Sequence, residues 1–365
     1  MAAWDASDAG RLGEALLHGS AEMSPQHAAT HRLGIAIARR DMAAVAALAD
    51  RDAGAFSSPL ARLRLARACA AMGIPPTYDE RWAAVDRRRV DAAVVLGQAG
   101  HGVRPGSAPF LFDQPIPIVE AEVDGKRGYF IVDTGAPHSA LSRGWCERSG
   151  IRFAPGVAHS VEDGSGREIA ATTVRIGSLQ AGAAARDVPA ILFDFPPGLD
   201  VAGILSPLDA FPGAVVTLDY AARRLMIGED APAQPGVALY WEGEVPLVHA
   251  RIAGDDAFLL LDSGAGGELL CEHYAQRFAS GPLRDATTAN AAGVIAIRTG
   301  LALPLAIGGE AARACSFAIK PCATTGSDTS LIGRDGFVGG GWMAGRRITI
   351  AADRLSFWFT PQEAP

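Results

Sequence analysis

Two short segments of the sequence could carry acid–base chemistry, because each ends a run of large apolar residues with an aspartate. Residues 130–136 read FIVDTGA and residues 259–265 read LLLDSGA. Average residue usage predicts only about 0.1 Asp-Thr-Gly or Asp-Ser-Gly tripeptides of each kind in such a chain, so finding both is informative. Two facing carboxylates share one proton, and one then acts as a base toward water while the other acts as an acid. Asp133 and Asp262 are therefore the candidate catalytic pair, with two unrelated aspartate turns at strand ends as the alternative.

An internal repeat of about 115 residues surrounds the two aspartates. Each copy opens with alternating apolar and polar residues and a glycine turn, at 115–125 and 245–254, and this pattern predicts a β-hairpin. Each copy closes with an Arg-Leu pair, at 224–225 and 354–355, at nearly the same distance from its aspartate. The repeat unit is thus predicted to be an all-β lobe.

Two lobes of this kind make the chain resemble the aspartic proteases, and among them the retropepsin-like type. In that type each lobe carries an Asp-Thr-Gly-Ala signature and, later, two apolar residues followed by glycine. The resemblance covers about residues 115–359 and points to the bacterial form of the pepsin and retropepsin superfamily in which two lobes are fused in one chain. It implies a mostly β fold of two homologous acid-protease β-barrel lobes, preceded here by an α-helical N-terminal domain.

The resemblance implies aspartic-type endopeptidase activity that needs no metal or organic cofactor. A water molecule held between Asp133 and Asp262 would be the nucleophile that attacks the peptide carbonyl. Two carboxylates this close are not both ionised cheaply, so the pair titrates in two separated steps, a property for which this family is known. A protein or a peptide is the expected substrate.

The residues that follow each aspartate have supporting roles in the resembled fold. There the hydroxyl groups of Thr134 and Ser263 bond across to the backbone of the opposite lobe, although local turns would also explain these residue types. Gly135 and Gly264 let the backbone turn sharply and present amide hydrogens to the carboxylates, which favours the ionised form.

Ala136 and Ala265 stand where pepsin-like enzymes often have a hydroxyl residue that donates a hydrogen bond to the catalytic carboxylate. Without such donors the charged form loses stabilisation, and the pKa values of the pair rise. We therefore expect a pH optimum less acid than that of gastric enzymes.

Two hairpin tips about 30 residues after the aspartates are candidate flaps, the β-hairpins that cover a bound peptide and exclude water. An ordinary surface hairpin would show the same pattern. The second tip is apolar and lacks the charges of the first, so the two flaps are expected to contribute unequally to substrate binding. The candidate residues are Asp163, Gly164, Ser165 and Gly166 in the first lobe, and Ala292 and Gly293 in the second.

Three further residues bear on the family pattern. Ser206 follows two apolar residues where glycine is expected, and the matching segment of the second lobe is assigned to residues 331–333, which read LIG. The serine side chain either crowds Asp133 or points away from it. Glu268 is interpreted as a surface residue, because a third carboxylate facing the pair would raise its pKa values further. His138 is also placed at the surface.

Residues 1–100 differ from the rest of the chain, since they are rich in alanine, leucine and arginine with apolar residues at helical spacing. Residues 58–73 carry a serine cap, a proline in the first turn and a terminal glycine. We predict a helical-repeat-like bundle here, a linker at 101–114, and lobes at 115–230 and 240–361. The bundle would brace the lobes, form a platform for a partner or substrate, or act as an inhibitory cover.

Composition excludes several classes of partner. The chain has 365 residues, a net charge of −7 and no basic block, which argues against nucleic acid and anionic membranes. No run of about 18 apolar residues indicates a membrane span. We expect a monomer with the N-terminal helices as the candidate surface for a protein partner. Its location would be periplasmic if a leader has been removed, and cytoplasmic otherwise.

The five cysteines lack the spacing of metal ligands, so no metal site is predicted, and their odd number leaves at least one unpaired. A bridge between Cys315 and Cys322 within the second lobe is one interpretation. Buried free thiols are the other.

The sequence as a whole predicts an aspartic endopeptidase. One alternative is a catalytically weak or inactive pseudoprotease that binds peptides through its cleft and its helical domain. Another is a helical interaction protein in which the β part is only structural. Retention of both aspartates favours the enzyme, because a pure binder has no physical need for two facing carboxylates.

Overall fold

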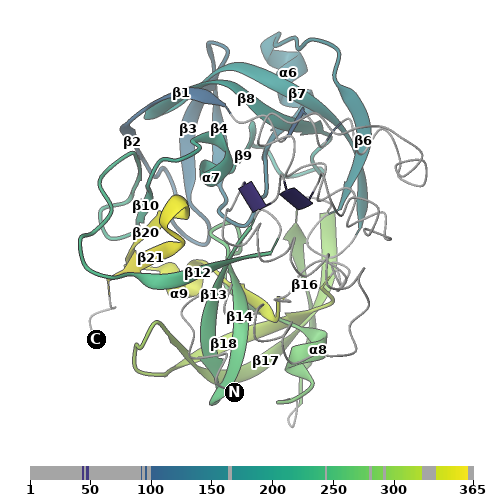
Figure 1. The fold of residues 1–365 in the computed structure, drawn as a ribbon. Coiled ribbons are helices and arrows are strands. Elements are labelled where there is room, and N and C mark those ends of the chain that lie inside the picture. The colour runs from purple at the N-terminus through teal and green to yellow at the C-terminus, as the bar shows by residue number, and fades with distance from the viewer. Residues whose placement is uncertain are drawn as a thin grey trace.

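The computed structural model describes residues 100–162, 167–242, 245–278, 282–290, 293–322 and 334–360, together with 43–44, 47–48, 92 and 95–96. The short stretches before residue 100 are helical, and the helical domain predicted over residues 1–100 otherwise lies outside the described residues. From residue 100 onward the chain is mostly β, in two lobes at the top and bottom of Figure 1. The predicted fold class is confirmed for this part of the chain.

The first lobe is an eight-stranded sheet. Its strands follow the order β1 (His101–Arg104), β8 (Ala183–Phe193), β5 (Ser139–Ser142), β9 (Gly203–Leu205), β4 (Lys126–Val132), β3 (Ile118–Val123), β7 (Glu168–Ala181) and β6 (Val157–Glu162). Helices α6 (Arg143–Ser149) and α7 (Pro207–Ala210) follow β5 and β9. In β3, buried Val119, Ala121 and Val123 alternate with outward residues, the pattern that the sequence shows for a hairpin strand.

The second lobe repeats this arrangement. Its strands follow the order β16 (Arg284–Asn290), β17 (Gly293–Ile307), β18 (Arg313–Lys320), β15 (Glu268–Cys271), β19 (Gly336–Val338), β14 (Asp255–Leu261) and β13 (Val245–Ile252). Helices α8 (Glu272–Ala275) and α9 (Gly340–Met343) take the places of α6 and α7.

A six-stranded run joins the lobes. It follows the order β2 (Gly106–Pro109), β11 (Arg224–Ile227), β10 (Val216–Asp219), β20 (Arg347–Ala351), β21 (Ser356–Phe359) and β12 (Val237–Glu242), with the short helix η3 (Ala352–Arg354) between β20 and β21. At its centre β10 pairs antiparallel with β20, and the hydroxyl oxygens of Thr217 and Thr349 lie 3.0 Å apart. The two halves of the repeat thus meet strand against strand.

Residues 101–114, which the sequence favours as a linker, contain two paired strands. β1 pairs with β8 at the edge of the first lobe, and β2 pairs with β11 in the central run. This segment therefore contributes backbone hydrogen bonds to both sheets, instead of connecting two domains as an unpaired stretch.

The strands that lead to the two aspartates occupy equivalent inner positions. β4 lies between β3 and β9, and β14 lies between β13 and β19, so the last residues of both strands are buried. The amide of Asp133 donates to Leu205 O at 2.9 Å, and the amide of Asp262 donates to Val338 O at 3.0 Å. Each aspartate is thus held at the end of a parallel strand pair.

These pairings correct the sequence alignment of the repeats. Ile131 is opposite Ile204 in the first lobe, and Leu260 is opposite Phe337 in the second. The second-lobe counterpart of Ile204-Leu205-Ser206 is therefore residues 337–339 (FVG), and the predicted match to 331–333 is wrong. Residues 331–333 themselves lie outside the described residues.

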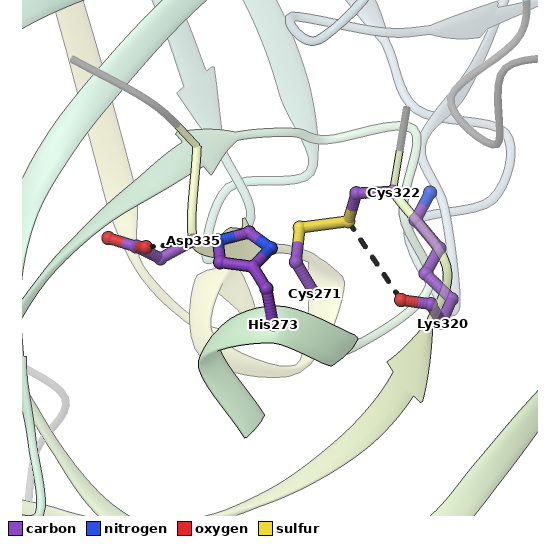
Figure 2. The surroundings of a disulfide bond; sticks show 5 residues. All are labelled: Cys271, His273, Lys320, Cys322 and Asp335. Carbon is purple, nitrogen blue, oxygen red and sulfur yellow. Dashed lines mark hydrogen bonds and ion pairs between the residues drawn. A yellow bond between two sulfur atoms is a disulfide. The ribbon is translucent and has the colours of Figure 1, made fainter. Parts of the chain in front are cut away.

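The cysteine pairing also differs from the interpreted Cys315–Cys322 bridge. Cys271, at the end of β15, is bonded to Cys322, just after β18, while Cys146 and Cys315 are buried free thiols. β15 and β18 are parallel neighbours, with Cys271 paired to Lys320, which brings the two sulfur atoms together. Figure 2 shows this bridge beside Lys320 and the His273–Asp335 pair.

Removing the disulfide by the double change Cys271→Ala and Cys322→Ala is expected to lower the free energy of unfolding by about 2–4 kcal/mol, because the bridge closes a long loop. The bridged residues are 51 positions apart. Guanidinium denaturation measures the loss. Cys315→Ala, which removes a buried sulfur from the same lobe, is the control, and an equal loss in both variants would contradict a constraint by the bridge.

Candidate active site

Each candidate aspartate is held by the backbone that follows it. Asp133 Oδ1 accepts hydrogen bonds from the amides of Gly135 at 2.8 Å and Ala136 at 2.9 Å. Asp262 Oδ1 accepts the equivalent bonds from the amides of Gly264 and Ala265, at 2.9 and 3.1 Å. One oxygen of each carboxyl group, Oδ1, is thereby fixed.

The two carboxyl groups face each other across the pair of glycines. A Cβ atom placed on Gly135 would lie 2.6 Å from Cγ of Asp262, and one placed on Gly264 would overlap the carboxyl group of Asp133. A hydrogen bond joins the two carboxyl groups. Glycine is therefore needed at both positions for the carboxyl groups to approach, a reason beyond the turn and the amide hydrogens that the sequence suggests.

The hydroxyl groups next to the aspartates tie the lobes together. Thr134 Oγ1 donates to Leu261 O at 2.6 Å, and Ser263 Oγ donates to Val132 O at 2.8 Å. Each hydroxyl oxygen also accepts from the opposite backbone, since Ser263 N donates to Thr134 Oγ1 at 3.1 Å and Thr134 N donates to Ser263 Oγ at 3.0 Å. Both residues are buried. These bonds cross between lobes, as the resemblance implied, and local turns do not account for them.

Burial raises the pKa of both aspartates. For Asp133 the neighbouring charge of Asp262 and the hydrogen bond to it raise the pKa further, to well above the ordinary carboxyl value. For Asp262, burial still raises the pKa, but the hydrogen bond from Asp133 and the positive charges of Lys320 and Arg334 work against it. The two carboxyl groups therefore titrate as a coupled pair, and the positive charges of Lys320 and Arg334 act on the Asp262 side of it.

Ser206 does not crowd Asp133. Its hydroxyl donates to Ala136 O at 2.7 Å, and its amide donates to Ser139 Oγ at 3.1 Å. At the equivalent Gly339 a Cβ atom would lie 2.5 Å from Ala265 O, so the second lobe has no space for a side chain there. The loop after Asp133 is thus supported by the hydrogen bond of the Ser206 hydroxyl. The loop after Asp262 is supported by close packing of backbone atoms against Gly339.

His138 and Glu268 are both buried, so their predicted surface positions are wrong. His138 Nδ1 lies 3.2 Å from Asp209 Oδ1, on α7. Glu268 Oε1 accepts a hydrogen bond from the amide of Trp342, on α9. Burial raises the pKa of Glu268. Both side chains therefore bond to the helix that follows β9 or β19, and help to fix the loops from behind.

The candidate flaps are two hairpins that lie at the right of Figure 1, β6–β7 in the first lobe and β16–β17 in the second. Residues 163–166 and Ala292 are outside the described residues, so the flap candidates among them are not placed. Gly293 is described and has a φ of +122°, and a Cβ atom on it would lie 3.6 Å from Nη1 of Arg167. The two hairpins therefore approach each other at their ends.

Lys320 and Arg334 are the site residues that sequence reasoning missed. Both carry positive charge toward Asp262, and neither stands next to the aspartate motifs in the sequence. Comparison of the two repeats could have revealed these cations. It does so only after residues 337–339 of the second lobe are aligned with residues 204–206 of the first.

Neither a metal cluster nor a membrane-spanning helix is found in the parts of the chain that the structure describes. There, no group of three or more His, Cys, Asp or Glu side chains is arranged to hold a metal ion. No helix within the same residues is long and apolar enough to cross a membrane.

Comparison with known proteins agrees with this geometry. Residues 119–206 match the family described as aspartyl protease, a segment that includes β3, β4, Asp133 and Ser206. Over this segment the match agrees with the resemblance to the aspartic proteases. No curated protein matches the chain.

Among solved structures, the chain is similar to an aspartic proteinase from Irpex lacteus. The two share 11% sequence identity over 71% of this chain and 98% of that chain, with a TM-score of 0.45.

Loss of either cross-lobe hydroxyl is expected to destabilise the protein. Thr134→Val leaves Leu261 O without its donor, and Ser263→Ala does the same to Val132 O. A buried unsatisfied group costs about 1–3 kcal/mol, so each variant should lose that much free energy of unfolding in urea denaturation. Thr299→Val, whose hydroxyl makes an exposed 3.4 Å bond, is the control and should change little. Equal losses at all three positions would contradict a special role for the crossing bonds.

The raised pKa values predict how the stability of the Asp133→Asn variant depends on pH. A carboxyl group whose pKa is raised in the folded state adds stability below its unfolded pKa, and this stability is lost as pH rises through the folded pKa. Asparagine does not ionise, so the melting temperature of Asp133→Asn relative to wild type should increase from pH 3 to pH 8. Exposed Asp353→Asn is the control. A pH-independent difference would contradict the raised pKa of Asp133.

Proposed function

We propose that this chain, whose first lobe belongs to the aspartyl protease family, is an endopeptidase that hydrolyses peptide bonds with a water molecule activated between Asp133 and Asp262. The observation that carries this proposal is the facing of two partly buried carboxyl groups across Gly135 and Gly264. Membership of the family supports a protease and a protein or peptide substrate. The catalytic residues and internal cleavage of the substrate are part of the proposal.

The two aspartates have different roles in the proposed mechanism. Asp262 is assigned as the ionised member, because the positive charges of Lys320 and Arg334 favour its carboxylate form. It takes a proton from water, which attacks the carbonyl carbon of the peptide bond. Asp133, which holds the shared proton, donates a hydrogen bond to the carbonyl oxygen and stabilises the charge that develops there. The tetrahedral intermediate breaks down when Asp262 passes the proton that it took from water to the peptide nitrogen, and the C–N bond breaks. The two carboxyl groups are then left sharing one proton.

The amides of residues 135–136 and 264–265 serve this mechanism by fixing one oxygen of each carboxylate. The crossing bonds of Thr134 and Ser263 fix the distance between the lobes. Neither carboxyl group then has to be reoriented during the reaction, which is the condition for efficient electrostatic stabilisation. The β6–β7 and β16–β17 hairpins are proposed to cover the substrate and exclude water.

The main alternative is an inactive peptide-binding protein, in which Ser206 or a closed flap prevents turnover. The Ser206 hydroxyl bonds to Ala136 O, three residues away from Asp133, and does not occupy the space between the aspartates. The contacts of Ser206 therefore give this alternative no support.

Replacement of either aspartate by asparagine is expected to reduce kcat/KM for peptide cleavage at least about 10³-fold, because each carboxyl group has a role that an amide cannot perform. The measurement is cleavage of a mixed peptide library between pH 3 and pH 8, with and without a statine-type inhibitor. Asp353→Asn, an exposed matched change, should cleave as the wild type does. Cleavage that persisted in both active-site variants would place the activity elsewhere.

A further inference from the structure

The corrected alignment of the two lobes shows a charge difference beside the candidate active site. Ser142 pairs with Phe193 in the first lobe, and Cys271 pairs with Lys320 at the equivalent position of the second. A buried phenylalanine in one lobe is thus replaced by a buried lysine in the other.

A second difference stands next to the first. The amide of Ala202 donates to Tyr129 O in the first lobe, and the amide of Asp335 makes the equivalent bond to Phe258 O in the second. The residues just before these amides are Val201 and Arg334. The first lobe therefore has two apolar residues at the positions where the second lobe has two cations.

Both cations lie against Phe337. Lys320 Nζ lies 4.0 Å from the centroid of the Phe337 ring, and Arg334 Cζ lies 5.0 Å from it. Phe337 packs in the same cluster as Leu260, whereas Leu261 and Val338 belong to the main core on the other face of the strands. Because side chains alternate along a strand, Asp262 points to the Leu260 and Phe337 face. The cations and the Asp262 carboxyl group therefore share one face of the second lobe.

Two acidic groups of this region, Asp262 and Asp335, differ in their other partners. Asp335 is already engaged, since its Oδ2 accepts from the amide of Phe258 at 2.9 Å and its Oδ1 lies 3.4 Å from His273 Nε2. The positive charges of Lys320 and Arg334 act on Asp262 and oppose the effect of burial on its pKa. Burial makes such an interaction stronger than it would be in water.

We propose that Lys320 and Arg334 are positioning residues that hold Asp262 ionised and leave the shared proton on Asp133, so that the two lobes take fixed and different roles. This rests on the proposed endopeptidase function. Two equivalent lobes would let the proton occupy either aspartate, and only one of the two arrangements would match a substrate bound in a given direction. The charges of Lys320 and Arg334 favour the arrangement in which the shared proton is on Asp133.

The test compares Lys320→Met, Arg334→Met and the double variant with wild type. Without the cations the ionised form of Asp262 loses stabilisation, so the acid limb of the pH profile of kcat/KM moves to higher pH. At a fixed pH on that limb, kcat/KM falls about tenfold for each pH unit of displacement. Lys320→Arg keeps the charge and should restore the wild-type limb, which a purely structural role for the side chain would not explain.

The chain offers a matched control, since Lys126 and Lys320 are its two lysines and Lys126 lies exposed at the β3–β4 turn. Lys126→Met should leave the profile unchanged. An unchanged acid limb in folded Lys320→Met and Arg334→Met proteins, with melting temperatures near that of wild type, would overturn the proposal. If Lys320→Met does not fold, Lys320→Gln and Arg334→Met decide the question by the same criterion.

A second readout separates this proposal from the proposed activity. Carboxyl-carbon NMR of protein labelled at aspartate follows the titration of Asp262 directly, with Asp262→Asn used to assign its signal, and needs no substrate. An upward shift of the Asp262 titration in the double variant supports the positioning role even if no peptide is cleaved. Cleavage of peptides together with an unmoved titration overturns the positioning role alone, and leaves the endopeptidase standing.

Discussion

The exchange of hydroxyl bonds between Thr134 and Ser263 is the interaction on which the candidate site depends. Each hydroxyl donates to a carbonyl of the other lobe and accepts an amide from it, so the four bonds form a closed and buried set. A shift of one lobe against the other would break several of them at once, and the freed groups would have no water to replace their partners. The spacing of the two carboxyl groups is therefore a property of the lobe interface.

That symmetric interface supports an asymmetric surrounding. Behind the first aspartate stand Ser206 and the His138–Asp209 pair, and behind the second stand Gly339 and Glu268 bonded to α9. On the face that the aspartates share with the neighbouring strands, the first lobe is apolar and the second is cationic. Duplicated backbone geometry thus holds the two carboxyl groups in place, while side chains that differ between the copies give them different charged surroundings.

Much of the fold could be predicted from the sequence, because apolar runs, glycine turns and the repeat act locally. The aspartates, the glycines beside them and the crossing hydroxyls follow from the two motifs. The position of residues 337–339 could not be predicted in the same way. The connection from β18 to β19 is longer than that from β8 to β9, and it contains an LIG tripeptide that imitates the expected pattern.

Burial and long-range pairing account for the other differences. His138 and Glu268 were placed at the surface because polar residues usually lie there, and only the packing of α7 and α9 behind the loops shows why they are inside. The Cys271–Cys322 bridge depends on β15 and β18 being parallel neighbours, which no local pattern reveals. In each of these places, residues far apart in the chain decide the structure.

The central run of strands also shows what each lobe would lack without the other. β10 of the first lobe and β20 of the second are paired along their full length. A single lobe without the other would expose this strand as an open edge, with unpaired amides and carbonyls along residues that are otherwise mostly buried. Such an edge is satisfied by a second copy of the same strand in antiparallel orientation. The fused chain therefore retains the geometry of a two-fold dimer, and covalent linkage has freed each half to diverge in charge without losing its partner.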